Sequence, residues 1–318
     1  MALDLSPHGK VALVAGGSRG IDAETARGSR HPRRLLPRFT GRSTIRLGKE
    51  FMKFAPFAFI LLAAAAILPP RPAAAQAPSP DNAAQKNSQQ ARAALNAMVA
   101  ALGGQLWLDM KNMMRQGQVA AFFQGNPDPG TEKTFEFHQW PDHDRIEVTK
   151  HRDVLEFFIG RQGWEVTYRG KKPLDKDIVD DYMRRRDHSI EVAVKLWMNE
   201  PNTILLYEGQ HMAERHLAEQ VTLISPQNDA ITILIDAQTH LPLQRIFQWR
   251  DPTYHDKNTD TEEYDDYHIV DGIPTPFTIT HLKNGDTVRQ YYVTRAAYNQ
   301  NLPDNFWDPD AAARKIKK

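Results

Sequence analysis

The 318-residue chain contains no cysteine. This absence excludes disulfide bonds, cysteine nucleophiles and metal sites built from thiolates, and it leaves no cysteine that could carry a lipid anchor. A chain without cysteine fits the bacterial periplasm and the cytosol equally well. The compartment therefore has to be inferred from other features of the sequence.

Net charge is also nearly absent, because 40 Lys and Arg residues are balanced by 39 Asp and Glu residues. This balance hides an asymmetry. Residues 1–53 carry 11 basic and 4 acidic side chains, whereas residues 76–318 carry 28 basic and 35 acidic ones. Binding of nucleic acid needs a cationic surface. The acidic character of the larger part therefore excludes a nucleic-acid partner.

Residues 1–51 contain a short apolar run followed by a glycine-rich turn, Ala15-Gly16-Gly17-Ser18-Arg19-Gly20-Ile21-Asp22. The turn resembles the nucleotide-binding turn of short-chain dehydrogenases, with Ala15 in place of a threonine and Asp22 in place of the last glycine. A carboxylate at that position would repel a bound pyrophosphate. We therefore predict that residues 1–51 are a dehydrogenase-like remnant without an independent fold, and that no cofactor is bound.

The remaining dehydrogenase chemistry requires a Tyr-x-x-x-Lys pair on one face of a helix. Tyr168 and Lys172 have this spacing, but Gly170 lies between them and Pro173 follows, which indicates a strand end and a turn. An NAD(P)-dependent oxidoreductase stays open as an alternative function because of the N-terminal turn.

Residues 52–75 have the pattern of a secretory signal peptide. Lys53 supplies the basic start, residues 54–68 form the apolar core, and Ala73-Ala74-Ala75 supplies the cleavage site. The apolar core is shorter than the about 20 residues that a membrane-spanning helix needs. We therefore predict export to the periplasm, with a soluble protein released by cleavage after Ala75.

The mature part is predicted to begin with a flexible leader at residues 76–90, which is rich in Ala, Pro, Ser, Asn and Gln. One domain is predicted at residues 91–318. A helix is predicted over residues 89–102, because apolar residues recur at helical spacing and Gly103-Gly104 follows. A second helical stretch, with an acidic start, is predicted over residues 175–199.

Outside these helices the hydrophobic pattern changes to a period of two, which predicts β-strands joined by short turns. The predicted strands cover residues 118–124, 131–140, 145–150, 154–159, 164–168, 203–207, 218–224, 230–236, 243–250, 261–269, 275–282 and 288–295. Consecutive strands of hairpin length favour an antiparallel meander. The predicted fold class is mainly β (α+β), with a strongly curved antiparallel sheet that forms an incomplete β-barrel covered by helices.

Three corner motifs follow one another in the second half of the chain, at residues 233–242, 264–276 and 299–307. The first ends in Leu241-Pro242, the second contains Asp271-Gly272-Ile273-Pro274, and the third contains Asn301-Leu302-Pro303-Asp304. In their order and spacing they resemble the LolA-like group of bacterial outer-membrane lipoprotein-sorting proteins, over about residues 95–309. The resemblance implies an incomplete barrel whose apolar concave face is covered by helices. It also implies a carrier of acyl chains across the periplasm that is not an enzyme.

Candidate cavity residues are apolar side chains of the predicted strands, because apolar contact contributes about 0.8 kcal/mol per buried methylene of an acyl chain. They are Phe122, Phe135, Phe137, Phe157, Ile159, Trp164, Leu206, Ile233 and Phe247. The inner side of a lid is predicted at Ile178, Tyr182, Val194, Trp197 and Met198. The same residues would equally fill an ordinary core, and this alternative stays open.

Three clusters of charged or metal-ligating side chains could in principle form other sites. His138, His143 and His151 surround a turn, but no carboxylate pattern supports metal ligation, so no metal site is predicted. An acidic loop at residues 251–266 lacks the ligand spacing of an EF-hand. The run Arg184-Arg185-Arg186 is predicted to be a solvated helix face, with anionic lipid headgroups or a membrane partner as the alternative.

The functional prediction is a non-catalytic, monomeric periplasmic carrier or binding protein for lipoprotein acyl chains or another lipid. A partner protein in the inner or outer membrane is compatible with this role. A periplasmic scaffold of the same shape without a ligand is the remaining alternative.

Overall fold

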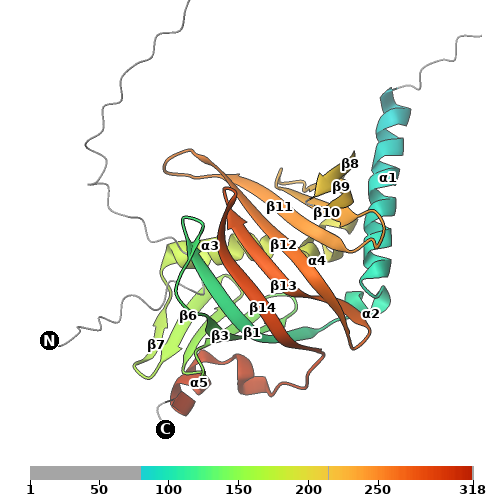
Figure 1. Cartoon of the computed structure of the whole chain (residues 1–318). Helices are drawn as coiled ribbons and strands as arrows, with labels where there is room; N and C mark the ends of the chain where they lie inside the picture. Colours follow the sequence, from blue (N-terminus) through green and yellow to red (C-terminus); the bar gives the residue numbers. More distant parts are fainter. Residues whose placement is uncertain (1–79, 214, 317–318) are drawn as a thin grey trace, which may run out of the picture. The chain divides into compact units, whose positions relative to one another are not determined.

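The described part of the chain is organised around one antiparallel sheet of 14 strands (Figure 1). The structure is a computed structural model that describes residues 80–213 and 215–316. The strands are β1 (Asn112–Phe123), β2 (Asn126–Pro127), β3 (Glu132–Gln139), β4 (His143–Val148), β5 (Val154–Ile159), β6 (Gln162–Thr167), β7 (Gly170–Pro173), β8 (Ile204–Ala213), β9 (His216–Ile224), β10 (Ala230–Asp236), β11 (Pro242–Arg250), β12 (Lys257–Val270), β13 (Ile273–Lys283) and β14 (Asp286–Tyr298).

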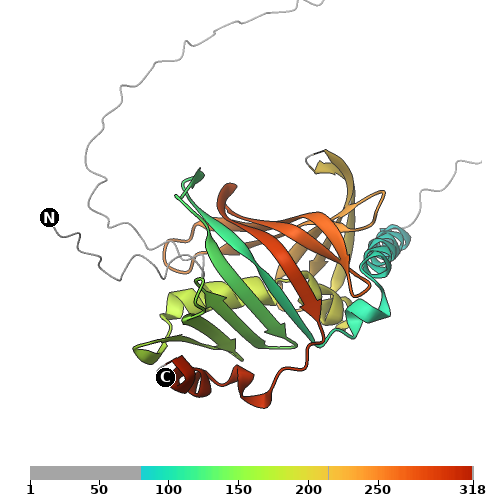
Figure 2. The ribbon, with the colours of Figure 1, turned by 60° about the horizontal axis from the view of Figure 1, so that its bottom comes forward.

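The chain enters this sheet in its middle. β1 pairs with β3 on one side and with β14 on the other, and the short β2 pairs only with β1. From β3 the strands follow one another to β7 at one edge, and from β8 at the opposite edge they return to β14. The sheet curves strongly (Figure 2), but its edge strands β7 and β8 do not pair with each other. The predicted incomplete barrel is thus confirmed.

Helices connect the two edges and cover the sheet. They are α1 (Pro80–Ala101), α2 (Gln105–Leu108), α3 (Lys176–Asp187), α4 (Ile190–Lys195), η2 (Trp197–Asn199), η3 (Asp304–Trp307) and α5 (Pro309–Ile316). We call the face of the sheet that contacts α3 and α4 the inner face, and the opposite face the outer face. α1 and α4 share one apolar cluster with β8, β9 and β10. The segment of η3 and α5 packs on the other side of the sheet, against β3, β5 and β6 (Figure 2).

The alternation of side chains along the strands assigns each residue to one of these faces. Arg115, Glu136 and Glu156 lie in one row of the inner face, because their strands pair in that register. The adjacent row, which includes Phe137 and Phe157, points to the outer face. Phe135 and Phe137 share one face and Glu136 and His138 the other, as the alternation predicted.

The position of α3 on the inner face depends on a residue without a side chain. A Cβ atom at Gly163 of β6 would lie 2.8 Å from Cγ2 of Val179 and 3.1 Å from Cδ1 of Leu174. Next to this contact the ring of Tyr182 stacks on Phe158, with the ring centroids 3.6 Å apart. Glycine in β6 therefore allows α3 to approach the sheet closely.

The structure extends the predicted elements and adds others. The predicted strand 230–236 coincides with β10 (Ala230–Asp236), whereas β12 and β14 are longer than predicted. The first helix begins at Pro80, so the predicted leader is helical from that residue onward. β2, β7, α2, η3 and α5 were not predicted, because each is short. The predicted remnant 1–51 and signal peptide 52–75 lie outside the described residues.

Within residues 80–213 and 215–316, no helix is long and apolar enough to cross a membrane.

Candidate inner-face pocket

A small pocket lies between the inner face of the sheet and the helices that cover it. Its volume is about 70 Å³. Apolar and aromatic side chains dominate its lining, which consists of Leu102, Trp107, Met110, Met113, Arg115, Ile190, Glu191, Pro242, Tyr264, Tyr267, Pro274, Thr275, Pro276 and Tyr298. Pockets that hold small-molecule ligands usually measure about 300–1,000 Å³. This inner pocket is therefore too small for an acyl chain as it stands, and a larger ligand requires its helical cover to move.

The cover consists of α1, α2 and α4, and the sequence explains why they lie there. In α1, Ala91, Leu95 and Met98 recur at helical spacing and are completely buried. Gly103 and Gly104 end this helix with positive φ angles of 113° and 59°, which reverse the chain into α2. Ser189 caps α4, since its Oγ accepts a hydrogen bond from the backbone N–H of Val192.

Few polar contacts join this cover to the rest of the domain. Asn87 of α1 donates a hydrogen bond to the carbonyl of Tyr207 at 2.7 Å and accepts one from its N–H at 3.0 Å. Arg92 donates to the carbonyl of Met198 at 2.9 Å. Lys195 of α4 donates to the carbonyl of Met110 at 3.4 Å, and its Nζ lies 5.5 Å from the ring centroid of Trp107. Apolar contact is therefore the main attachment of the cover.

The tyrosines of the inner pocket turn their hydroxyl groups away from its apolar space. Tyr264 donates to Glu262 at 2.9 Å, and Tyr267 donates to the carbonyl of Pro242 at 2.7 Å. Tyr298 shares a hydrogen bond of 2.6 Å with Thr275. Burial raises the pKa of Tyr264 and of Tyr267 well above the usual tyrosine value, so both remain neutral donors. The ring faces are left as hydrophobic lining.

Two charged residues reach the inner pocket from opposite walls. Arg115 of β1 pairs with Glu136, with Nη2 3.0 Å from Oε2, while its Nε is buried without a hydrogen-bond partner. Glu191 comes from the covering helix α4. An apolar ligand in this pocket would therefore lie beside a paired guanidinium group.

Beyond the pocket, the inner face of β11 to β13 carries a buried charged cluster. Arg245 and Asp260 are both 2% exposed, with Nη1 3.2 Å from Oδ1, and His281 Nε2 lies 2.6 Å from Oδ2 of Asp260. Burial lowers the pKa of His281 even though Asp260 opposes the shift. Ionic groups that are buried and paired in this way make poor contacts for hydrocarbon. The apolar part of the inner face is therefore the half under α1 and α4.

Two of the predicted cavity residues belong to the inner face. Ile233 is completely buried in the cluster shared with α1 and α4. Phe247 is 2% exposed and stacks against His188, with the ring centroids 4.3 Å apart. Neither side chain lines the 70 Å³ pocket, but both lie on the face that the helices cover.

Five predicted cavity residues lie on the outer face instead. Phe135 and Phe137 form a cluster with Trp307 of η3. Phe157, Ile159 and Trp164 pack with Ala312 of α5. The alternation placed these residues on one face, but the docking of the C-terminal segment decides what covers that face. They fill a core outside the helix-covered side.

The last two predicted cavity residues lie at margins of the sheet. Phe122 is half-buried near the end of β1, opposite Pro127 of β2. Leu206 lies on the edge strand β8 and is 36% exposed.

The predicted lid residues do occupy the connection between the sheet edges. Val194 and Met198 are buried in the cluster with α1, and Trp197 packs against it. Ile178 and Tyr182 pack on a separate cluster of β4, β5 and α3. The first three belong to the cover of the inner pocket, whereas the other two belong to the closely packed α3.

The other clusters have structural partners. Arg186 pairs with Asp144 at 3.2 Å, and the guanidinium carbon of Arg184 lies 4.6 Å from the ring centroid of Trp249. The arginine run is therefore engaged within the domain, which corrects the prediction of a solvated face. His138 lies 2.5 Å from Asp144. Tyr168 is 68% exposed in the turn between β6 and β7, as Gly170 predicted.

Several lining residues were not predicted, although a signal for them exists. Pro242, Pro274 and Pro276 belong to the corner motifs that carry the LolA-like resemblance, and the structure brings those corners together at the inner pocket. Trp107 and Tyr298 lie outside the predicted elements, where the period-two pattern carries no information. The corner motifs therefore pointed to the lining of this pocket better than the apolar alternation of the strands did.

Comparisons with known proteins complete the description of the site. No protein family and no curated protein matches the sequence. A DUF1329 family protein from Desulfovibrio piger has a similar structure, with a TM-score of 0.48 and 11% identity over 70% of this chain and 98% of that one. An outer membrane lipoprotein-sorting protein domain from Vibrio parahaemolyticus has a TM-score of 0.46 and 8% identity over 73% and 100% of the two chains.

A LolA superfamily protein from Nitrosomonas europaea is similar as well, with a TM-score of 0.44 and 13% identity over 70% and 98% of the two chains. Two of these three structures are described as a lipoprotein-sorting protein domain and a LolA superfamily protein, the group that the corner motifs resemble. At these TM-scores the similarity carries no conclusion about what this chain binds.

Proposed function

We propose that this protein is a non-catalytic carrier or binding protein for the acyl chain of a lipid or lipoprotein. The observation that carries the proposal is the inner pocket, which is lined by apolar and aromatic side chains beneath helices that few polar contacts attach. Export through residues 52–75 would place this activity in the periplasm.

The pocket can open if contacts between the helices and the sheet are replaced by contacts with an acyl chain. An acyl chain entering beneath α1 and α4 would replace the contacts that Leu95, Met98 and Ile190 make with the sheet. Each buried methylene contributes about 0.8 kcal/mol, which offsets the apolar contacts that the cover loses. Within the cover α2 and α4 are short, with four and six residues, and none of its helices is paired with a strand.

Binding is tested by titration of the protein, purified from the periplasm, with a fluorescent fatty acid. N-terminal sequencing of the same sample should give a start near Gln76. Saturable binding with the protein still folded is expected, and NADH should give no saturable signal. Saturable binding of NADH in place of the fatty acid would favour the oxidoreductase alternative and overturn the proposal.

Adjacent methionines of β1 provide a matched pair of variants. Met113 lines the inner pocket, whereas Met114 packs on the outer face with Phe135 and Phe137. A carboxylate introduced into apolar surroundings costs several kcal/mol. Met113→Glu should therefore weaken fatty-acid binding at least about tenfold, while Met114→Glu should lower stability without a selective loss of affinity. Equal affinities in both variants would place the ligand elsewhere.

Movement of the cover can be followed directly because the chain has no cysteine. A cysteine introduced at the exposed Ala100 of α1 would be the only labelling site for an environment-sensitive fluorophore. Its emission should change on addition of fatty acid to the protein and should not change in the Met113→Glu background.

A further inference from the structure

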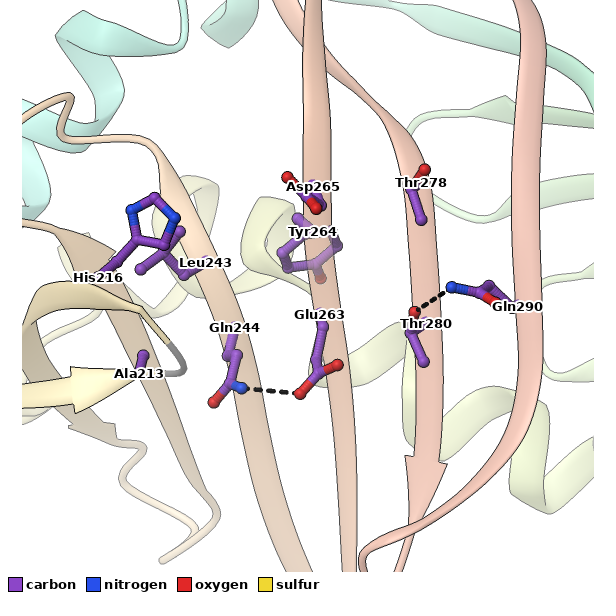
Figure 3. A pocket seen from close by; sticks show the side chains of 10 residues that line it. All are labelled: Ala213, His216, Leu243, Gln244, Glu263, Tyr264, Asp265, Thr278, Thr280 and Gln290. Carbon is purple, nitrogen blue, oxygen red and sulfur yellow. Dashed lines mark hydrogen bonds between the residues drawn. The ribbon is translucent and has the colours of Figure 1, made fainter. Parts of the chain in front are cut away.

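The outer face carries a second pocket, which is larger than the inner one and has a different chemistry. It measures about 320 Å³ and lies over β11, β12, β13 and β14 (Figure 3). Four of its polar side chains form a single row across these strands, because the strands pair in that register. They are Gln244, Glu263, Thr280 and Gln290. Asp265 and Thr278, which also pair, form a second row two residues away.

Hydrogen bonds between these side chains hold them in defined orientations. Gln244 Nε2 donates to Glu263 Oε1 at 2.8 Å, and Gln290 Nε2 donates to Thr280 Oγ1 at 3.2 Å (Figure 3). The hydroxyl of Tyr292 donates to Gln290 Oε1 at 2.5 Å. Polar groups that are fixed before a ligand arrives lose less conformational entropy on binding. The outer pocket is thus a preorganised polar surface.

Hydrogen-bonding capacity remains on this surface. Gln244 uses one N–H for Glu263, which leaves its carbonyl oxygen and its second N–H for a ligand. Thr278 and Asp265 line the same pocket from neighbouring strands (Figure 3). Neighbouring groups of one row lie at about the strand spacing of 4.8 Å.

The charges of the outer pocket restrict the ligand. None of the described residues that line it is Lys or Arg, whereas Glu263 and Asp265 supply carboxylates. An anionic ligand would be repelled. A neutral molecule with several hydroxyl groups would donate to the carboxylates and accept from the amide groups.

An exposed aromatic ring borders the same surface. Tyr292 of β14 pairs with Thr278 and is 43% exposed. Its ring offers an apolar face to C–H groups, while its hydroxyl is held by Gln290. A sugar ring matches this surface, because hydroxyl groups project from its edge and C–H groups cover its faces.

We propose that the outer pocket binds a neutral carbohydrate, with Gln244, Asp265 and Gln290 holding its hydroxyl groups and Tyr292 contacting its ring. The polar row of this site is on the face of the sheet opposite to the inner pocket, and Tyr264 of β12 lines both pockets. A calcium ion is the competing ligand, but calcium takes six to eight oxygen ligands. The described residues contain no group of three or more His, Asp and Glu that could hold a metal ion.

The test uses the full protein and saturation-transfer NMR with three soluble sugars: N-acetylglucosamine, chitotriose and maltotriose. At least one sugar should bind saturably. Gln244→Ala and Gln290→Ala should each weaken that binding about fivefold to tenfold, as expected for the loss of one or two hydrogen bonds. Tyr292→Ala should remove the transfer signals of the sugar C–H protons.

Gln248→Ala is the matched control, because Gln248 lies on the same strand and face as Gln244 but does not line the pocket. This variant should bind the sugar like the unmodified protein. The proposal is overturned if no sugar shows saturable binding, if Gln248→Ala and Gln244→Ala lose binding equally, or if only calcium chloride binds at these residues.

Discussion

Both faces of the sheet bury aromatic side chains, but the two covers differ in kind. On the outer face the C-terminal segment fills the space, and the rings of Phe137 and Phe306 meet edge to face with centroids 4.8 Å apart. On the inner face α1, α2 and α4 leave a pocket of about 70 Å³ between Trp107 and Tyr264. The difference teaches that hydrophobic strand residues identify buried faces, whereas the covering segments decide which face can open.

The largest effect is expected from a substitution beneath η3 and α5, which cover the outer face. Phe137→Asp would bury a carboxylate between Trp307 and Phe306, which costs several kcal/mol. Loss of folding is expected, and circular dichroism during thermal unfolding would measure it. Phe123→Asp is the control, because Phe123 is 55% exposed and should tolerate the change. A folded Phe137→Asp protein that has lost only fatty-acid binding would show that the filled face is the carrier face.

A pH-dependent effect is expected on the inner face beneath α3. Glu156 of β5 is 1% exposed and lies opposite Glu165 of β6, and each has one carboxylate oxygen without a hydrogen-bond partner. Burial, with a contribution from Glu165, raises the pKa of Glu156 to about 8. The folded state therefore holds a proton that the unfolded chain releases near pH 4.5. The free energy of unfolding should decrease as the pH rises from about 4.5 to about 8.

Glu156→Gln should remove this dependence, which amounts to at most a few kcal/mol over the whole interval at about 1.4 kcal/mol per pKa unit. Urea unfolding at pH 5 and pH 8 would measure the difference between the variant and the unmodified protein. Glu165→Gln is the matched control and should reduce the dependence only in part, because it removes the repulsion but leaves the burial. Parallel pH profiles for Glu156→Gln and the unmodified protein would contradict the prediction.

The sequence was sufficient for the antiparallel pairing of consecutive strands and for the side-chain alternation, and insufficient for the pairing of β1 with β14 and for what covers each face. The period-two pattern placed Phe135 and Phe137 together correctly, because alternation is a local property of the strand. It could not show that Trp307 and Ala312 would cover that row, since this depends on the distant C-terminal segment. The charged cluster around Arg245 was also invisible, because its partners lie on neighbouring strands.

A smaller and more local effect is expected from a substitution in α1, one of the helices that cover the inner pocket. Asn87 joins α1 to the edge strand β8 through two hydrogen bonds with Tyr207, and Asn87→Ala would remove both. The loss should amount to about 1–2 kcal/mol and should loosen α1 without unfolding the sheet. Faster hydrogen exchange of α1 amides and faster uptake of the fluorescent fatty acid are the expected readouts. Asn96→Ala, at an exposed position of α1, should change neither.

The smallest effect is expected from a change outside both covers, the deletion of residues 1–51. This segment contains one predicted strand and a glycine turn, and its sequence supplies no second strand with which the first could pair. An isolated strand buries too little apolar area to offset the entropy of ordering it. Thermal unfolding of the shortened protein should therefore agree with that of the full chain within about 0.5 kcal/mol. A larger loss of stability would mean that residues 1–51 contribute to the fold, and the export signal at residues 52–75 would then need to be reconsidered.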